Sequence, residues 1–360
     1  MAQLRPPGGK SGAPPGGLHT DGGGSPRPAQ WALPEDVSTS TDDTILTPEQ
    51  VARWKRDRYL VLDGLWPAEL IAEAVATAAA EFPDPSETHP AATLGEGQSG
   101  FGGIGTNREF PFDSEHDVYN MLTLHPRVLR CCSQLLGTSG LRLTRSNYGA
   151  KYGANGHELP RTEFDGGWPT GDQNMHCDFG NNTMLVPSRE RPDCVAGICY
   201  LNRVEDGGGA TGIVPYDPSL PEGMPVETAG GWGRQHGWEG HQIYEKEKLV
   251  RYKPGTVLLY RMDTYHRGTI VYPEGVRRVW GAVWRRADAD YVHAGGQGMH
   301  GVGNGAFGQF AHIFPRVSPY QRSVVGFPMP GVDYWNADTV ERVGVRYPGV
   351  DMTPYAQARL

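Results

Sequence analysis

The sequence has few cysteines, no long apolar run and no excess of basic residues. Its five cysteines contain no CxxC pair, and we interpret them as free, buried thiols of a protein in a reducing cytosol. The longest apolar stretches, such as 70–80, contain charges and fall short of the ~18 uninterrupted apolar residues of a membrane span. The net charge of -8 provides no basic surface for nucleic acid, and no basic segment followed by an apolar one marks a secretory signal. We therefore expect a cytoplasmic protein that binds neither membranes nor nucleic acid.

Glycine and proline are abundant instead, with 50 and 30 residues in a chain of 360. Residues 1–34 hold 8 glycines and 7 prolines but few large apolar side chains, so burial there cannot offset the entropy lost on ordering. We predict a disordered tail over 1–44, a single domain over 45–290 and a loop-rich extension over 291–360. The extension is rich in glycine and aromatic residues, and we expect it to pack on the domain and cover the mouth of its pocket.

Helical patterns come before strand patterns in the predicted domain. Thr47, Pro48 and Gln50 form the start signal of a helix, a second helix is predicted to start at Pro67, and a third covers 125–137 and stops at Gly137. From Leu141 onward, short β-rich runs alternate with turn clusters. This order predicts a mainly β fold of the sandwich or jelly-roll type with helices packed outside a sheet.

The sequence His176-Cys177-Asp178 carries the first chemical signal. In a strand, His176 and Asp178 project to one face, and Cys177 projects to the core on the other. An imidazole and a carboxylate side by side are two of the three ligands in a 2-His-1-carboxylate iron site, and the third ligand must come from another strand. A second His-x-Asp sequence begins at His19, inside the predicted tail, where no fixed geometry is expected.

The second signal is His266, at the end of an apolar strand that begins near Pro254, followed 11 residues later by Arg277. Histidine is a second candidate ligand, and the planar fork of an arginine binds a carboxylate bidentately in the same cavity. Between the neighbours Arg277 and Arg278, alternation favours Arg277, because it shares a face with the small residues Val279 and Gly281. Each arginine considered alone is also compatible with a solvated or paired role.

Together, His176, Asp178, His266 and Arg277 resemble the metal and 2-oxoglutarate signature of the phytanoyl-CoA hydroxylase-like Fe(II)/2-oxoglutarate dioxygenases. The resemblance extends over the segments LTPEQVARWKRDRYLVLDGLWPAELI, LHPRVLRCCSQLLG and KPGTVLLYRMDTYHRGT. It implies a double-stranded β-helix, which is a cupin-like jelly roll, with Fe(II) held by the two histidines and the aspartate. It also implies that 2-oxoglutarate binds through Arg277, and that O2 is the oxidant, with succinate and CO2 as co-products.

The resemblance carries further implications for single residues. Asn147 lies where related ectoine hydroxylases have a 2-oxoglutarate-contacting asparagine, and Lys151 is a weaker candidate on the same run. Many relatives have a hydroxyl residue two positions after the second histidine. That position is Gly268 here, so Thr269 or another group is expected to take over this role. Because Asp178 is present, the resemblance implies hydroxylation or another oxidation such as desaturation, and not halogenation.

Two other functions remain open from the sequence. A zinc hydrolase would also use histidine and carboxylate ligands, but it leaves Arg277 without a role. A jelly-roll binding protein would hold no metal and would show no turnover. The hypothesis carried forward is an oxygenase that hydroxylates a small-molecule metabolite, whose identity and whose oligomeric partners the sequence does not indicate.

Overall fold

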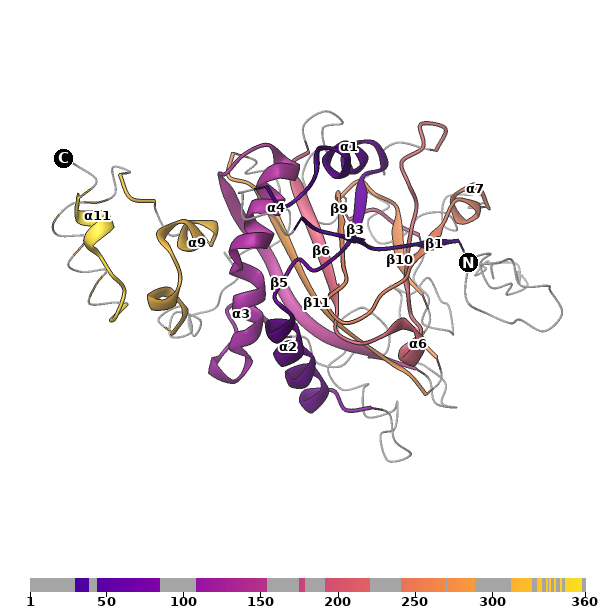
Figure 1. Cartoon of the computed structure of the whole chain (residues 1–360), viewed down its shortest axis with the longest axis horizontal. Helices are drawn as coiled ribbons and strands as arrows, with labels where there is room; N and C mark the ends of the chain where they lie inside the picture. Colours follow the sequence, from indigo (N-terminus) through magenta and orange to yellow (C-terminus); the bar gives the residue numbers. More distant parts are fainter. Residues whose placement is uncertain are drawn as a thin grey trace, which may run out of the picture.

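The structure is a computed structural model of the chain (Figure 1). It describes residues 30–38, 44–84, 108–153, 175–178, 192–220, 241–269, 271–272, 274–288 and 312–325, together with several positions between 329 and 357. No helix in these ranges combines the length and the apolar character that crossing a membrane requires.

Four helices lie side by side on the outer face of the larger of two β-sheets (Figure 1). They are α1 (Pro48–Asp57), α2 (Ala68–Glu81), α3 (Asp117–Leu124) and α4 (Pro126–Leu136). As predicted, Thr47 caps α1 in a capping box with Gln50, and α4 ends at Gly137, whose φ of 67° suits glycine. The sequence patterns indicated α1, α2 and α4, whereas α3 was not predicted.

The larger sheet has seven strands in the order β2-β3-β9-β6-β11-β5-β4. Its long central strands pair antiparallel, and the full set is β2 (Glu35–Asp36), β3 (Tyr59–Asp63), β4 (Arg108–Glu109), β5 (Leu141–Tyr152), β6 (Cys194–Tyr200), β9 (Val257–Tyr260) and β11 (Val276–Arg286). Three of the predicted β-rich runs, 141–152, 194–200 and 276–286, therefore form neighbouring long strands of this sheet.

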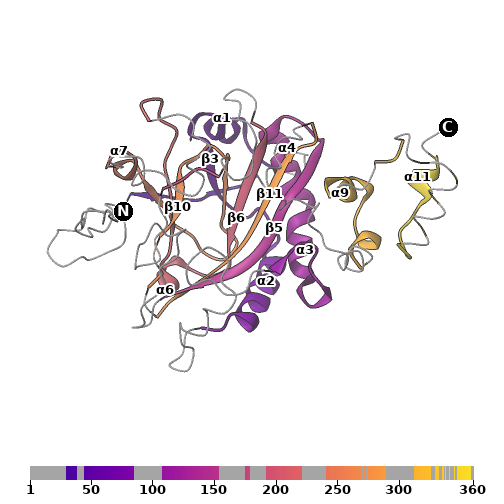
Figure 2. The same cartoon turned by 180° about the vertical axis from the view of Figure 1, so that it is seen from behind.

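The smaller sheet faces the inner side of the larger one (Figures 1 and 2). Its order is β1-β8-β7-β10, formed by β1 (Trp31–Ala32), β8 (Lys248–Val250), β7 (Thr211–Ile213) and β10 (His266–Gly268). Two short helices flank its strands, α6 (Val204–Gly207) and α7 (His241–Glu245). The two facing sheets, with helices outside, form the predicted double-stranded β-helix.

Alternation along β5 and β11 separates two cores. One face of these strands carries Tyr148, Trp280 and Trp284, which pack against the helices in the larger core. The opposite face looks toward the smaller sheet, and there apolar residues of both sheets, such as Leu258 and Ile213, form the second core. The second core contains the cavity that we describe below, so the larger sheet separates this cavity from the helices.

Part of the predicted tail takes part in both sheets, so its boundary at residue 44 is wrong. Trp31 and Ala32 pair with β8, and Glu35 and Asp36 pair with β3. Arg251 N donates to Ala32 O, and Val37 N donates to Asp63 O. Few apolar residues are needed here, because the exposed backbone groups of a sheet edge bind this segment. The glycine-rich residues 1–29, including His19, lie outside the described residues.

The apolar run that ends with His266 was predicted to form one strand, but it forms two. It forms β9 in the larger sheet and β10 in the smaller sheet, joined by a turn in which Thr264 N donates to Arg261 O. Asp263 accepts hydrogen bonds from the Arg261 guanidinium, which fixes the turn locally. The chain therefore changes sheets immediately before His266, and this change directs the imidazole into the space between the sheets.

The described part of the extension lies on the helix side, beyond α3 in both views (Figures 1 and 2). It contains a 3-10 turn (Phe314–Arg316), α9 (Pro319–Val324) and α11 (Thr353–Gln357). Gln321 donates to Leu124 O at the end of α3, and Arg142 of β5 donates to Ser323 O. The expectation of a cover over the pocket is wrong for these residues, because the cavity opens on the other face of the sheet. Residues 291–311 lie outside the described part.

Candidate metal centre and its cavity

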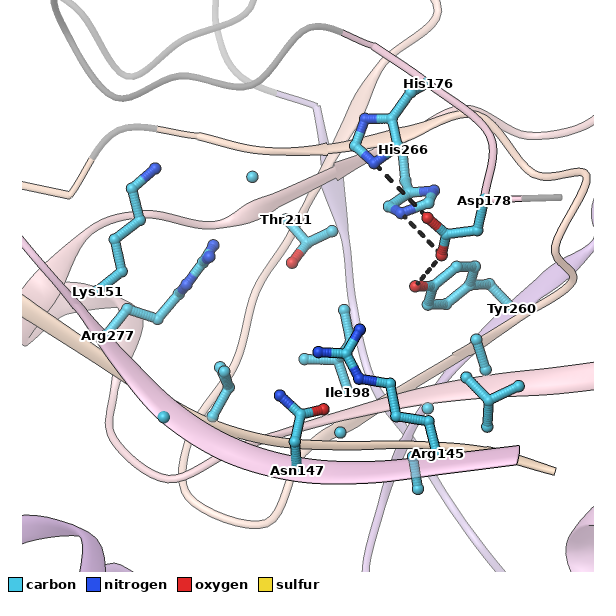
Figure 3. Close-up of a pocket in the computed structure, with 18 of the residues that line it drawn as sticks. Arg145, Asn147, Lys151, His176, Asp178, Ile198, Thr211, Tyr260, His266 and Arg277 are labelled. Atoms are coloured by element: carbon cyan, nitrogen blue, oxygen red, sulfur yellow. Dashed lines mark hydrogen bonds and ion pairs between the residues drawn. The ribbon is translucent and has the colours of Figure 1, made fainter. Parts of the chain in front are cut away.

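The side chains of His176, Asp178 and His266 converge at one end of the space between the sheets (Figure 3). One ligand atom from each lies within 4.8 Å of the others. His176 Nε2 is 3.7 Å from Asp178 Oδ1, and His266 Nε2 is 3.5 Å from Asp178 Oδ2. Two imidazole nitrogens and one carboxylate oxygen at these separations can bind one metal ion on one side and leave its other positions open.

The backbone holds the two histidines opposite each other. His176 and His266 form an antiparallel bridge in which each backbone N–H donates to the other residue's carbonyl, at 3.0 and 2.9 Å. Asp178 follows His176 in a turn, and Cys177, which lies between His176 and Asp178, is buried in the second core. The predicted alternation is therefore correct for these residues, although the described part of this segment is a single bridge and not a long strand.

Neighbouring groups orient two of the ligands. His266 Nδ1 lies 3.0 Å from the carbonyl oxygen of Thr264. A carbonyl only accepts hydrogen bonds, so Nδ1 carries a proton, and Nε2, on the side of Asp178, is the nitrogen that can bind a metal. The Tyr260 hydroxyl donates to Asp178 Oδ2 at 3.0 Å. These contacts hold the tautomer and the carboxylate orientation that metal binding requires.

The charges around Asp178 favour its ionised form. Burial raises the pKa of Asp178, but His266, His176, the Tyr260 hydroxyl and Arg145 together outweigh burial and hold this pKa below its usual value. Burial and the negative charge of Asp178 raise the pKa of Tyr260 well above its ordinary value. Tyr260 is therefore a hydrogen-bond donor at neutral pH, and Asp178 is an acceptor that is ready to bind a cation.

A cavity of about 200 Å³ adjoins the three candidate ligands. Its floor is formed by the inward faces of β5, β6 and β11, and small or apolar residues such as Ile198, Val279 and Gly281 line much of it. At the end away from the ligands lie Arg277 and Lys151, which are register partners on adjacent strands (Figure 3). A metal ion and a short organic anion therefore have adjoining places in one cavity.

The structure separates the two neighbouring arginines. Arg277 lines the cavity, where its Nη1 donates to Gly209 O at 2.6 Å, and its buried Nε has no hydrogen-bond partner. Arg278 lies on the other face of β11, where it donates to Phe82 O and forms an ion pair with Asp84. Of the two, Arg277 is therefore the one that can meet a ligand, as the alternation of the strand indicated.

The structure also locates the weaker candidates. Asn147 and Lys151 both line the cavity, whereas Thr269 is buried and its hydroxyl donates to Ala210 O. Thr211, which is the register partner of Gly268, also lines the cavity. Thr269 is therefore not among the residues that line the cavity, whereas Thr211 on the neighbouring strand is.

Three polar residues of the cavity were missed by the sequence reasoning, namely Arg145, Thr211 and Tyr260. Arg145 shares its face of β5 with Asn147 and Lys151, so alternation counted back from Asn147 would have found it. Tyr260 and Thr211 carry no such signal, because their roles depend on how the two sheets face each other.

Comparisons with known proteins add structural similarity only. No family model matches the chain, and no curated protein matches it. Among solved structures, it is similar to the epimerase SnoN in complex with Fe3+, alpha ketoglutarate and nogalamycin RO, with 20% identity, 68% of this chain and 84% of that chain covered, and a TM-score of 0.47. EctD from S. alaskensis in its apoform has 17% identity, coverage of 72% and 84%, and a TM-score of 0.48.

A third similar structure is that of the non-heme alpha ketoglutarate dependent carbocyclase SnoK from nogalamycin biosynthesis. It has 15% identity, covers 68% of this chain and 86% of that chain, and has a TM-score of 0.43. All three TM-scores are below 0.5.

Proposed function

We propose that the protein is a non-heme Fe(II)- and 2-oxoglutarate-dependent oxygenase that acts on a small molecule. The observation that supports this most is the placement of His176, Asp178, His266 and Arg277 in one cavity, with the arginine at the end away from the three ligands. A protein that binds a chelating keto acid needs two groups: a metal ion that keeps open coordination positions, and a cation that binds the distal carboxylate of the acid.

Each group of the chain has a defined part in this proposal. His176, Asp178 and His266 would hold the iron, which together with the keto acid and O2 would supply the oxidation, with succinate and CO2 as co-products. Arg277 binds the distal carboxylate of 2-oxoglutarate, and the hydroxyl of Thr211 and the amide of Asn147 face the same cavity. Tyr260 and Thr264 orient Asp178 and His266. The apolar strand residues exclude water from the reacting atoms.

The finer assignments belong to the same proposal. They rest on the motif resemblance and on composition. They are membership of the phytanoyl-CoA hydroxylase-like group, hydroxylation in preference to another oxidation, a small-molecule metabolite as substrate, and a cytoplasmic location. The absence of nucleic-acid and membrane partners rests on the net charge of -8 and the lack of long apolar runs.

A zinc hydrolase is less well supported by this cavity. Such an enzyme needs a general base near the metal-bound water. Among the described residues that line the cavity, the carboxylate is Asp178, which already belongs to the ligand set. Arg277 and Lys151 at the other end also have no evident part in hydrolysis.

Anaerobic absorption spectroscopy tests the proposal. Addition of Fe(II) and 2-oxoglutarate to the metal-free protein should produce a weak visible metal-to-ligand band. His266→Ala or Asp178→Ala should abolish the band, whereas His19→Ala, in the first segment of the chain, should leave it intact. If the metal-loaded wild-type protein shows no band with 2-oxoglutarate, the proposal is wrong.

A further inference from the structure

A second arginine, Arg145, faces the cavity of the proposed active site. The proposed function gives this arginine no group to bind. Arg145 lies on β5, two residues before Asn147, and its side chain reaches into the cavity below Asp178 and Tyr260 (Figure 3). Its Nε is buried and has no hydrogen-bond partner. An unpaired guanidinium nitrogen in a cavity costs free energy, and a bound anion removes that cost.

Arg145 and Arg277 enter the cavity from positions that lie far apart along the sheet. Arg277 is the register partner of Lys151, and Val283 is the register partner of Arg145. The two arginines therefore enter the cavity from positions six residues apart along β5, roughly 20 Å of extended strand at about 3.4 Å per residue. Figure 3 shows Arg277 beside Lys151 at one side and Arg145 near the metal ligands at the other. If Arg277 binds the distal carboxylate of 2-oxoglutarate, Arg145 is left for another ligand.

The charge of the cavity supports the same conclusion. Among the described residues that line it, Arg145 and Arg277 are arginines with a buried Nε that has no hydrogen-bond partner, and Asp178 is the one carboxylate. A divalent metal and a 2-oxoglutarate dianion cancel each other in charge, so binding both leaves the excess of cations unchanged. A further organic anion reduces this excess in a partly desolvated space, where unbalanced charge is costly.

We propose that the oxidised substrate is an organic carboxylate whose acid group is bound by Arg145. This inference rests on the proposed function. The planar fork of one arginine matches a carboxylate bidentately. The neighbouring surface, which includes Ile198 and Val283, is apolar. This apolar surface suits the carbon skeleton of a carboxylic acid. It suits a phosphate dianion less well, because a phosphate dianion requires more hydration.

Binding measurements with matched acids and amides test the proposal. Zn(II) replaces iron so that no turnover occurs, 2-oxoglutarate is saturating, and calorimetry measures the binding of benzoate, hexanoate, benzamide, hexanamide and phenyl phosphate. We expect at least one acid to bind about tenfold or more tightly than its amide, the effect of one charge-assisted hydrogen-bond pair. If each amide binds as well as its acid, or phenyl phosphate binds more tightly than both acids, the proposal is wrong.

Variants separate this inference from the proposed function. Arg145→Leu should remove the preference for the acid and leave the affinity for 2-oxoglutarate within about twofold, whereas Arg145→Lys should keep part of the preference. Arg251→Leu is the matched control, because Arg251 is an exposed arginine that pairs with Glu205 outside the cavity. If Arg145→Leu instead weakens 2-oxoglutarate binding and spares the acids, Arg145 belongs to the co-substrate site. Failure of the iron and 2-oxoglutarate band in wild-type protein would refute the proposed function itself.

Discussion

The hydroxyl of Tyr260 should control metal affinity through Asp178, although it is not itself a ligand. It donates to Asp178 Oδ2 at 3.0 Å from a ring that is 5% exposed. A hydrogen bond to a charged group is worth about 1.5–3 kcal/mol, and losing a partner of a metal ligand typically weakens metal binding by about 10–100-fold. We therefore expect Tyr260→Phe to bind Mn(II) or Zn(II) at least about tenfold more weakly than the wild-type protein.

The direction also follows from the electrostatics of the site. The Tyr260 hydrogen bond is one of the contributions that lower the pKa of Asp178, so its removal raises that pKa. The proton then competes with the metal at a higher pH than in the wild-type protein. Calorimetric titration of the metal-free protein at several pH values should show a larger affinity loss at lower pH.

Tyr252→Phe is the matched control for this experiment. Tyr252 is a buried tyrosine whose hydroxyl donates to Gly208 O, away from the three ligands. Both variants lose one buried hydroxyl, but only Tyr260→Phe loses a contact with a ligand. Equal metal affinity in Tyr260→Phe and wild type, or an equal loss in both variants, would refute the reasoning.

Three further predictions concern the fold and the co-substrate. Arg277→Leu should weaken 2-oxoglutarate binding measured by calorimetry, while Arg278→Leu should lower the urea midpoint without this loss; the reverse result would exchange their roles. Thr47→Ala removes the cap of α1 and should lower the free energy of unfolding by about 1 kcal/mol, so an unchanged urea midpoint would contradict the capping box. Burial raises the pKa of Tyr59 and Tyr200 to about 12. The unfolded chain ionises these phenols near pH 10, so stability should fall between pH 10 and 12, and phenolate absorbance that rises before unfolding would contradict this.

Local rules predicted the parts of the molecule that depend on neighbours in sequence. Thr47 and Gln50 form the expected capping box, and Gly137 ends its helix with a positive φ. Alternation along β11 distinguished Arg277 from Arg278, because adjacent residues of a strand must face opposite sides. His176 and Asp178 line one cavity for the same reason.

Features that depend on contacts between distant segments could not be predicted in this way. The pairing of Trp31 with β8 uses backbone groups at a sheet edge, which no side-chain pattern reveals. The change of sheet before His266 depends on a turn that interrupts an apolar run. Thr211 stands opposite Gly268 only because β7 and β10 are paired, which the sequence around Gly268 does not show.

A crystal structure of the protein with Mn(II) and 2-oxoglutarate, grown without oxygen, tests the central claim most directly. We predict a metal ion bound by His176, Asp178 and His266, with the distal carboxylate of 2-oxoglutarate on Arg277. Metal bound at other residues, or 2-oxoglutarate bound away from Arg277, would contradict the proposed oxygenase site.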